Sequence, residues 1–473
     1  MHPNIIYIFS DQHRFCDVGY AGNSEVETPN LDNLARTGAW FTSSYSNCPL
    51  CVPARGTLLT GLHALKHGAA ANDLPVLTSK PSIANILNDA GYNTGYIGKW
   101  HLGGVPRNQF IQEDTRLGFT YWNGCNCNHA YMDAYYDDNE NVRHKIEGYE
   151  PFTQTDLAIQ YMNEHKGGGQ PWALWLAMGT PHDPYDALPA DELARWRSKH
   201  LSLRKNVDME NVEHLFGPKP DIENDYAGYY AHIYLLDQQI GRIVDWLRAN
   251  DELENTIIVY SSDHGDMLGS HGYLNKQMYF EESAKVPLVV NWHGHIPAGQ
   301  RKQPISLVDH APTLLGLIGL DGLPDMDGTD QSAVLQDPSA AGQKAVYLYS
   351  YVPCHQALFR PLQSWRAIVT EKEKYVASQD GDAVALYDLE NDPYEQRNLA
   401  TDNTFVQLKA QLSALLADQV AHHDGYQAWQ NLLKNHGLWQ AWEDSDAYFQ
   451  KIWAVFVAEH SDKTEGDIKN EGL

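Results

Sequence analysis

Two cysteines, two prolines and an arginine stand close together in the segment "NCPLCVPARGTLLTG", residues 47–61. Cys51 comes two residues before Pro53, and proline is favoured in the first turn of a helix. The thiol is therefore expected near a helix N-terminus, where free N–H groups and the helix dipole favour an anion. Arg55 lies about one turn further on. These residues alone leave three interpretations of Cys51 open: a nucleophile of low pKa, a structural core cysteine, or a chemically modified side chain.

Acidic side chains follow two predicted strands. Asp11 comes after the apolar run 5–9, and Asp263 with His264 comes after the run 256–260. Ligands bind at strand ends in open α/β sheets, so these side chains can meet at one sheet edge. Two converging carboxylates need a cation between them. Oxygen ligands favour Ca²⁺ or Mg²⁺, whereas an imidazole ligand favours Mn²⁺ or another transition metal. The alternative is that each aspartate only caps a helix or a turn.

Strands and helices alternate along the first part of the chain, as a sheet covered by helices requires. We predict buried strands at 5–9, 172–178 and 256–260, and helices at 30–36 with Asn30 as the N-cap, at 81–90 and at 229–247. In the last of these helices, apolar residues recur every three or four positions and so share one face. The pattern predicts an α/β fold with a large sheet flanked by helices.

The pattern changes near residue 345. Short, partly alternating β runs continue to about residue 400 and predict a small antiparallel sheet, and the chain then becomes helical and rich in tryptophan. We therefore predict an N-terminal catalytic domain, residues 1–340, and a C-terminal subdomain, residues 341–473. The aromatic tail suits either the lining of a binding pocket or the interface of a homo-oligomer.

Composition narrows the classes of partner. The chain has 473 residues, of which 43% are hydrophobic, which is typical of a globular protein. Its net charge of −27 argues against nucleic acid or an anionic membrane as a partner, so an anionic substrate needs a locally positive pocket. No apolar run approaches membrane-spanning length. The first apolar run lacks a basic flank, so we expect a cytoplasmic protein, or a periplasmic or secreted one if a leader was removed.

Several segments together resemble one family. "CVPARGTLLTG" resembles the signature of the formylglycine-dependent sulfatases, in which a Cys or Ser precedes the Pro and Arg. Further segments resemble that family in the same order along the chain: "NIIYIFSDQHR", "GYIGKWHLG", "GTPHDPY", "SSDHGDMLGSHG", "NKQMYFEESAKVPLVV" and "LYDLENDPYEQRNLA". The chain is thereby identified as a member of the type I sulfatases of the alkaline phosphatase-like superfamily. This implies an α/β fold with a large mixed sheet and a C-terminal subdomain built on an antiparallel sheet.

The resemblance implies a metal and a modified residue. It implies that Cys51 is oxidised to Cα-formylglycine by a dedicated maturation enzyme. It also implies one divalent metal, Ca²⁺ first and Mn²⁺ or Mg²⁺ as alternatives, held by Asp11, Gln12, Asp263 and His264. Many family members have Asp-Asp and Asp-Asn at these two pairs. The pairs found here resemble the branch of choline sulfatases and phosphonate monoester hydrolases, and the neutral Gln12 weakens the attraction for a cation but favours an anionic substrate.

The resemblance also implies which side chains act on the substrate. The implied catalytic set is Cys51, Arg55, Lys99, His101, His182 and Lys276, and the implied substrate-binding set is Asn72, Lys99, His182 and Lys276. A hydroxyl of the hydrated formylglycine attacks sulfur while the metal and the two lysines neutralise the sulfate oxygens. The His182 and Lys276 side protonates the leaving alcohol. His101 helps the second hydroxyl to expel sulfate, and Arg55 holds the diol.

Three classes of function follow. We predict a sulfuric ester hydrolase that acts on a sulfated carbohydrate or another small sulfate ester. The alternative is a phosphonate monoester or phosphodiester hydrolase, which the metal motif permits and which the Lys99 and His101 pair disfavours. The third class, a binding protein that has lost catalysis, is disfavoured by the intact set of charged residues. The segment "NGCNCNHAY" contains Cys125, Cys127 and His129 but fits no standard zinc spacing, so we expect a loop near the substrate entrance.

Overall fold

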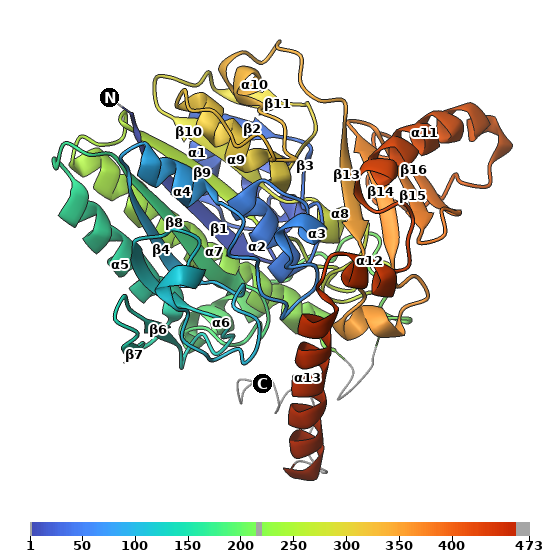
Figure 1. Ribbon diagram of the computed structural model, residues 1–473, viewed down its shortest axis with the longest axis horizontal. Helices are drawn as coiled ribbons and strands as arrows, with labels where there is room; N and C mark the ends of the chain where they lie inside the picture. Colours follow the sequence, from blue (N-terminus) through green and yellow to red (C-terminus); the bar gives the residue numbers. More distant parts are fainter. Residues whose placement is uncertain (1, 214–219, 460–473) are drawn as a thin grey trace.

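The computed structural model describes residues 2–213 and 220–459, and within them the central feature is a mixed sheet of ten strands (Figure 1). In sheet order the strands are β11 (Gly299–Arg301), β2 (Ala39–Phe41), β10 (Leu288–Trp292), β9 (Thr256–Ser262), β1 (Asn4–Asp11), β8 (Trp172–Pro181), β4 (Asn93–Lys99), β5 (Tyr121–Cys125), β6 (Tyr135–Asp137) and β7 (Arg143–Lys145). The strands from β9 to β5 are parallel to one another. Their carboxyl ends therefore lie along one edge of the sheet, and the predicted α/β fold is confirmed.

Helices cover both faces of this sheet. One face is covered by α2 (Cys51–Thr60), α4 (Ile83–Asp89) and α9 (Leu307–Leu317). The other is covered by α1 (Pro29–Thr37), α5 (Glu150–His165) and α7 (Ile222–Ala249). Side chains alternate along a strand, so Ile5, Tyr7 and Phe9 of β1 join the first core while Ile6 and Ile8 join the second. Because β1 is buried on both faces, it reads as a continuous apolar run.

Shorter elements complete the N-terminal part. They are the helices α3 (Ala64–His67), α6 (Ala190–Arg197), α8 (Glu281–Ala284) and α10 (Ser332–Gln336), and the paired strands β3 (Ser44–Tyr45) and β12 (Ile305–Ser306). The predicted cap of the first helix is wrong. Helix α1 begins at Pro29 after Thr28, and Asn30 instead donates from Nδ2 to Asp237 of α7 at 2.8 Å. A contact with a distant helix thus replaces the local cap.

The C-terminal part contains the predicted antiparallel sheet. Its strands are β13 (Ala345–Ser350), β14 (Trp365–Thr370), β15 (Glu373–Ser378) and β16 (Ala383–Asp388). The helices α11 (Val406–His423), α12 (Trp429–Asn435) and α13 (Trp439–Glu459) follow (Figure 1). The boundary between domains at residue 340 remains a prediction. Among the described helices, none combines the length and apolar character that crossing a membrane requires.

A buried ion pair ties the C-terminal sheet to the end of α11. Arg366 on β14 donates from Nε to Asp424 at 2.7 Å, and both side chains are fully buried. The guanidinium also donates to Ser364 Oγ at 2.8 Å and lies over the ring of Tyr351. A buried charge that loses its partner is strongly destabilising, so this pair makes the sheet and the helix depend on each other.

We expect the substitution Asp424→Ala to lower the free energy of unfolding by about 3–5 kcal/mol, because it leaves the Arg366 charge buried and unpaired. The control is Asp418→Ala, which removes an exposed aspartate near the end of the same helix and should change stability by less than about 0.5 kcal/mol. Urea denaturation followed by tryptophan fluorescence compares the two. Equal effects of both substitutions would show that the buried pair does not join these elements.

Candidate active site

Four neighbouring parallel strands end at one place. Lys99 is the last residue of β4, His182 follows β8, Asp11 ends β1, and Asp263 follows β9. The parallel pairing of β1 with β9 makes Asp11 and Asp263 neighbours, although they are far apart in the sequence. Gln12 has a left-handed φ of 74°, and its N–H donates to Asp263 Oδ1 at 3.1 Å. The turn after β1 therefore holds one of the two carboxylates.

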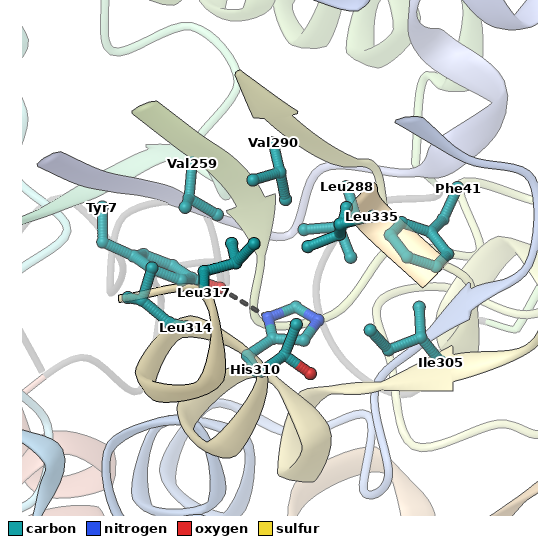
Figure 2. Close-up of a pocket in the computed structure, with 11 residues that line it drawn as sticks. Tyr7, Phe41, Val259, Leu288, Val290, Ile305, His310, Leu314, Leu317 and Leu335 are labelled. Carbon is teal, nitrogen blue, oxygen red and sulfur yellow. Dashed lines mark hydrogen bonds between the residues drawn. The ribbon is translucent and has the colours of Figure 1, made fainter. Parts of the chain in front are cut away.

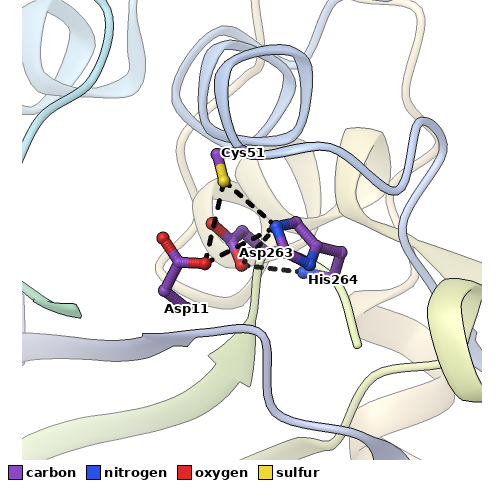
Figure 3. Close-up of side chains that lie close together, drawn as sticks. All are labelled: Asp11, Cys51, Asp263 and His264. Carbon is purple, nitrogen blue, oxygen red and sulfur yellow. Dashed lines mark hydrogen bonds and ion pairs between the residues drawn. The ribbon is translucent and has the colours of Figure 1, made fainter. Parts of the chain in front are cut away.

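Helix α2 brings Cys51 to these carboxylates. Cys51 is the first residue of α2, so the predicted position at a helix N-terminus is confirmed. Figure 3 shows its Sγ directed at the two neighbouring strand ends, 3.2 Å from His264 Nε2 and 3.7 Å from Asp11 Oδ1. One ligand atom from each of Asp11, Cys51, Asp263 and His264 lies within 4.8 Å of the others, and all four residues are buried.

Arg55 holds the outer oxygens of both carboxylates. Its Nη2 donates to Asp11 Oδ2 and its Nε donates to Asp263 Oδ2, both at 3.0 Å. Its Nη1 donates to the carbonyl of Lys99 at 2.6 Å. The guanidinium is fully buried, so its charge offsets the repulsion between the two carboxylates with little screening by solvent. Because Arg55 occupies the Oδ2 atoms, the Oδ1 atoms remain on the side of Cys51 and His264.

The donors in this cluster fit a divalent cation. Nδ1 of His264 lies 2.8 Å from the carbonyl of Gly265 and must donate to it, so Nε2 carries the lone pair of the neutral ring. That Nε2 lies 3.5 Å from Asp11 Oδ1 and 3.6 Å from Asp263 Oδ1. Burial and the adjacent Asp11 charge raise the pKa of Asp263, and a cation would relieve this repulsion. Two carboxylates and one imidazole are a donor set that binds a divalent metal.

Gln12, the fourth predicted ligand, lies beside the cluster with its amide bonded elsewhere. Its Oε1 accepts from Lys276 Nζ at 2.8 Å. Its Nε2 donates to Asp266 at 2.6 Å and to the hydroxyl of Tyr185 at 3.3 Å. The structure thus places Gln12 between the candidate metal cluster and Lys276, and its part in metal binding stays a prediction.

Of the two Lys and His pairs expected from the sequence, the first has its side chains on different aspartates. Lys99 Nζ donates to Asp11 Oδ2 at 2.6 Å, and His101 Nε2 lies 3.4 Å from Asp73 Oδ1. In the part of the chain described, the buried Nδ1 of His101 has no hydrogen-bond partner. In the second pair, Lys276 Nζ lies 2.5 Å from His182 Nε2. His182 Nδ1 faces the carbonyl of Asp183 at 2.7 Å and must donate to it, so Nε2 accepts from Lys276.

These basic groups make the position of Cys51 favourable for an anion. Burial opposes ionisation of the Cys51 thiol, but the charges of Lys276 and Lys99 outweigh it and hold the pKa of the thiol well below the usual value. Burial also opposes the charge of Lys99. The contact with Asp11 outweighs this effect and raises the pKa of Lys99 above its usual value. A strongly acidic protein therefore carries the locally positive site that an anionic substrate needs.

Three side chains at this site were absent from the predicted set. His129 Nε2 accepts from Lys99 Nζ at 2.9 Å, and its ring stacks on that of His182 with centroids 4.3 Å apart. Asp73, which contacts His101, is held by two nitrogens of Arg107 at 2.9 Å each.

The sequence could have indicated the position of His129. Strand β5 ends next to Lys99 in a parallel pair, and His129 follows shortly after β5. The pairing of Asp73 with Arg107 joins two loops, and no local pattern in the sequence indicates it.

A separate small cavity lies in the core rather than at the strand edge. It lies between α9 and the sheet, and Figure 2 shows His310 facing Tyr7 there; their side chains share a hydrogen bond of 2.6 Å. Its volume is about 20 Å³ and its other lining residues are mostly aliphatic. A cavity of this size holds about one water molecule and is too small for an ester substrate. Burial lowers the pKa of His310 to about 3, so the ring is neutral.

Known proteins resemble this chain over most of its length. A family model described as "Sulfatase" matches residues 3–320, and one described as "N-sulphoglucosamine sulphohydrolase, C-terminal" matches residues 269–422. The chain is 33% identical to an ulvan-active sulfatase of Formosa agariphila, over 89% of this chain and 81% of that protein. It is 26% identical to an N-acetylglucosamine-6-O-sulfatase of Bacteroides thetaiotaomicron, over 88% and 86%. The crystal structure of a predicted sulfatase of Bacteroides fragilis superposes with a TM-score of 0.78 at 26% identity, covering 89% of this chain and 96% of that one.

We expect Ca²⁺ or Mn²⁺ to raise the Tm of the protein, because a ligand that binds only the folded state stabilises it, by about 2.7 kcal/mol at 100 times its Kd. Thermal unfolding with added metal, and with a chelator, measures the shift. The substitution Asp263→Asn should remove most of this Tm shift, because the cluster then loses a negatively charged metal ligand. Asp237→Asn is the control, since this buried aspartate bonds Asn30 instead and should leave the metal shift intact. An unchanged shift in Asp263→Asn would place the metal elsewhere.

Proposed function

Since the chain belongs to the sulfatase family, we propose that this site hydrolyses the sulfate ester of a carbohydrate, with formylglycine at position 51 as the nucleophile. The class of enzyme, a sulfuric ester hydrolase, follows from the family. Relatives named for ulvan and for N-acetylglucosamine 6-sulfate support a sulfated carbohydrate as the substrate. The observation that carries the proposal is the position of Cys51, at the start of α2 and in contact with His264 and Asp11.

Two groups that the sequence does not encode, formylglycine and a divalent metal, would lie at position 51 and in the neighbouring cluster. A maturation enzyme would convert Cys51, and Sγ marks the place of the oxygen that replaces sulfur. The hydrated formylglycine supplies a hydroxyl nucleophile, and a divalent metal held by Asp11, Asp263, His264 and Gln12 supplies positive charge for that hydroxyl and for a sulfate oxygen.

Two buried lysines would bind the sulfate oxygens. Lys99 and Lys276 are 1% and 9% exposed, so water screens their charge little. Each also has a fixed partner, Lys99 on Asp11 and Lys276 on Gln12, which holds the ammonium group in place before the substrate arrives. Both charges lie near enough to Cys51 to lower the pKa of its thiol. Fixed charges of this kind stabilise the charge that develops in the transition state.

The leaving alcohol would receive its proton from the pair of Lys276 and His182. Lys276 Nζ carries the proton that is shared with His182 Nε2 at 2.5 Å. Transfer of that proton to the ester oxygen makes the alcohol a better leaving group. His129 stacks flat on His182 and accepts from Lys99, so it fixes the plane of the ring that takes part in the transfer.

His101 would accept the proton of the second hydroxyl when sulfate is released. Its buried Nδ1 is free of other hydrogen bonds among the described residues. Burial opposes a charge on His101, but the contacts with Cys127 and Asp73 raise its pKa to about 10, so these partners favour the ring in the form that has taken up the proton. Asp73 holds the opposite nitrogen, Nε2, and stabilises the ring once it is protonated.

Mass spectrometry tests the modification of Cys51. Tryptic cleavage after Arg36 and Arg55 releases a peptide, residues 37–55, that contains both Cys48 and Cys51. In protein made with the maturation enzyme we expect a loss of about 18 Da at position 51, the difference between cysteine and formylglycine. Cys48 in the same peptide is the internal control and should remain unmodified. A free thiol at position 51 under these conditions would overturn the proposed nucleophile.

The substitution Cys51→Ala should lower kcat/KM for 4-nitrophenyl sulfate by about 10³-fold or more, because it removes the nucleophile. The matched control is Cys48→Ala, which removes a buried thiol that packs in another core and should change kcat/KM only a few-fold. A phosphonate monoester assayed in parallel distinguishes the alternative substrate class. Turnover of the phosphonate without turnover of the sulfate would contradict the proposed function.

A further inference from the structure

Two series of contacts lead away from Cys51 and meet at Phe449 on α13. In the first, the N–H of Val52, the residue after Cys51, donates to Asn72 Oδ1 at 3.1 Å. Asn72 Nδ2 lies 3.5 Å from His355 Nε2. The His355 ring in turn meets the Phe449 ring edge-on, with centroids 6.2 Å apart. The path runs from the reacting position through the loop after β13 to the C-terminal helix.

The second series begins at His101, whose ring contacts Cys51. Asp73 Oδ1 lies 3.4 Å from His101 Nε2, and both oxygens of Asp73 bind Arg107. The Arg107 guanidinium lies over the Phe449 ring, 5.0 Å from its centroid. The same aromatic side chain is thus reached from the reacting position along two separate paths.

The outer residues of both paths are more exposed than the inner ones. Cys51 is 1% and Asn72 is 9% exposed, the Arg107 side chain is 19% exposed, and solvent reaches His355 and Phe449. The outer residues therefore form a rim between the buried reacting position and water. A substrate whose sulfate reaches Cys51 must place its leaving group beside such a rim.

Structural constraints hold Phe449 in this position. Rings of Trp429, Trp439 and Trp442 pack together with centroids 5.2–6.2 Å apart, and they anchor the first turn of α13 beside α12. From there α13 extends away from the two sheets (Figure 1), and Phe449 on this helix is half-buried. The half-buried ring gains a cation–π contact with Arg107 but keeps part of its surface open.

The polar atoms around Phe449 are suited to a sugar. Arg107 uses Nε and Nη2 on Asp73, and among the described residues its Nη1 has no hydrogen-bond partner. The charges of Asp73 and Arg107 cancel, so a ligand needs no charge of its own to bind beside this pair. The exposed imidazole of His355 has two ring nitrogens, which can donate and accept hydrogen bonds. A half-buried aromatic ring with donors and acceptors beside it matches a pyranose ring, which has an apolar face and peripheral hydroxyls.

We propose that Arg107, His355 and Phe449 bind the sugar ring that carries the sulfate, with Phe449 as the stacking platform. This inference rests on the proposed function, because it concerns the leaving group of the same reaction. It assigns the C-terminal helix a part in substrate recognition, one of the two uses that suit an aromatic tail. The three residues contact substrate hydroxyls and C–H groups and take no part in bond breaking.

The experiment compares full-length wild type with Phe449→Ala, Phe449→Trp and Gln450→Ala. Substrates are 4-nitrophenyl sulfate, N-acetylglucosamine 6-sulfate and ulvan oligosaccharides, and the Ki of inorganic sulfate reports on the sulfate-binding part alone. We expect Phe449→Ala to raise KM for the sulfated sugar about tenfold or more while kcat and the Ki of sulfate stay within about twofold. Phe449→Trp keeps an aromatic face and should restore KM. Gln450→Ala removes an exposed side chain of the same helix and should behave as wild type.

A second variant, at a residue outside α13, tests the same subsite without changing that helix. Arg107→Lys keeps a cation for Asp73 but loses Nη1, so it should also raise KM for the sugar and leave the Ki of sulfate unchanged. If wild type hydrolyses a sulfated sugar and both Phe449→Ala and Arg107→Lys do so with unchanged KM, the inference is wrong and the proposed function stands. Turnover of 4-nitrophenyl sulfate with no sulfated sugar accepted would likewise overturn the sugar subsite. Failure of wild type to hydrolyse any sulfate ester would instead refute the proposed function.

Discussion

The contact of Arg55 with both Asp11 and Asp263 is the interaction on which the site depends. Two buried carboxylates at adjacent strand ends repel each other, and a buried guanidinium bonded to one oxygen of each makes their proximity tolerable. The same contact sets the direction of the remaining oxygens, which face Cys51 and His264. Arg55 lies on α2 and the carboxylates lie on the sheet, so the ion pair also positions the helix whose first residue is Cys51.

The charges around this centre form a connected network. Asp11 holds Lys99, Lys99 bonds His129, His129 stacks on His182, and His182 bonds Lys276. Each cation therefore has an anion or a neutral acceptor beside it, which lowers the cost of burying positive charge. The network ends at Gln12, whose neutral amide joins Lys276 to Asp266. An acidic chain can in this way present positive charge at one edge of its sheet.

The C-terminal part contributes to the site without supplying any of the clustered charges. The buried pair of Arg366 and Asp424 ties its sheet to α11, and the tryptophan cluster continues this connection to α13. His355 and Phe449 then reach the surroundings of Arg107. Under the proposals made above, the chemistry and the recognition of the leaving group would be supplied by different parts of the chain.

Local patterns in the sequence determined the strands at 5–9, 172–178 and 256–260, the helix start at Cys51, and the position of Asp11 and Asp263 after strands, because periodicity and a proline at a helix start act over a few residues. The family resemblance identified Lys99, His101, His182 and Lys276, which the tertiary structure brings together at that sheet edge. Only the tertiary structure decided the partners of Gln12 and Asn30, the place of His129, and the meeting of Arg107 with Phe449. Each of these is a contact between segments distant in sequence, and packing and strand register alone fix such contacts.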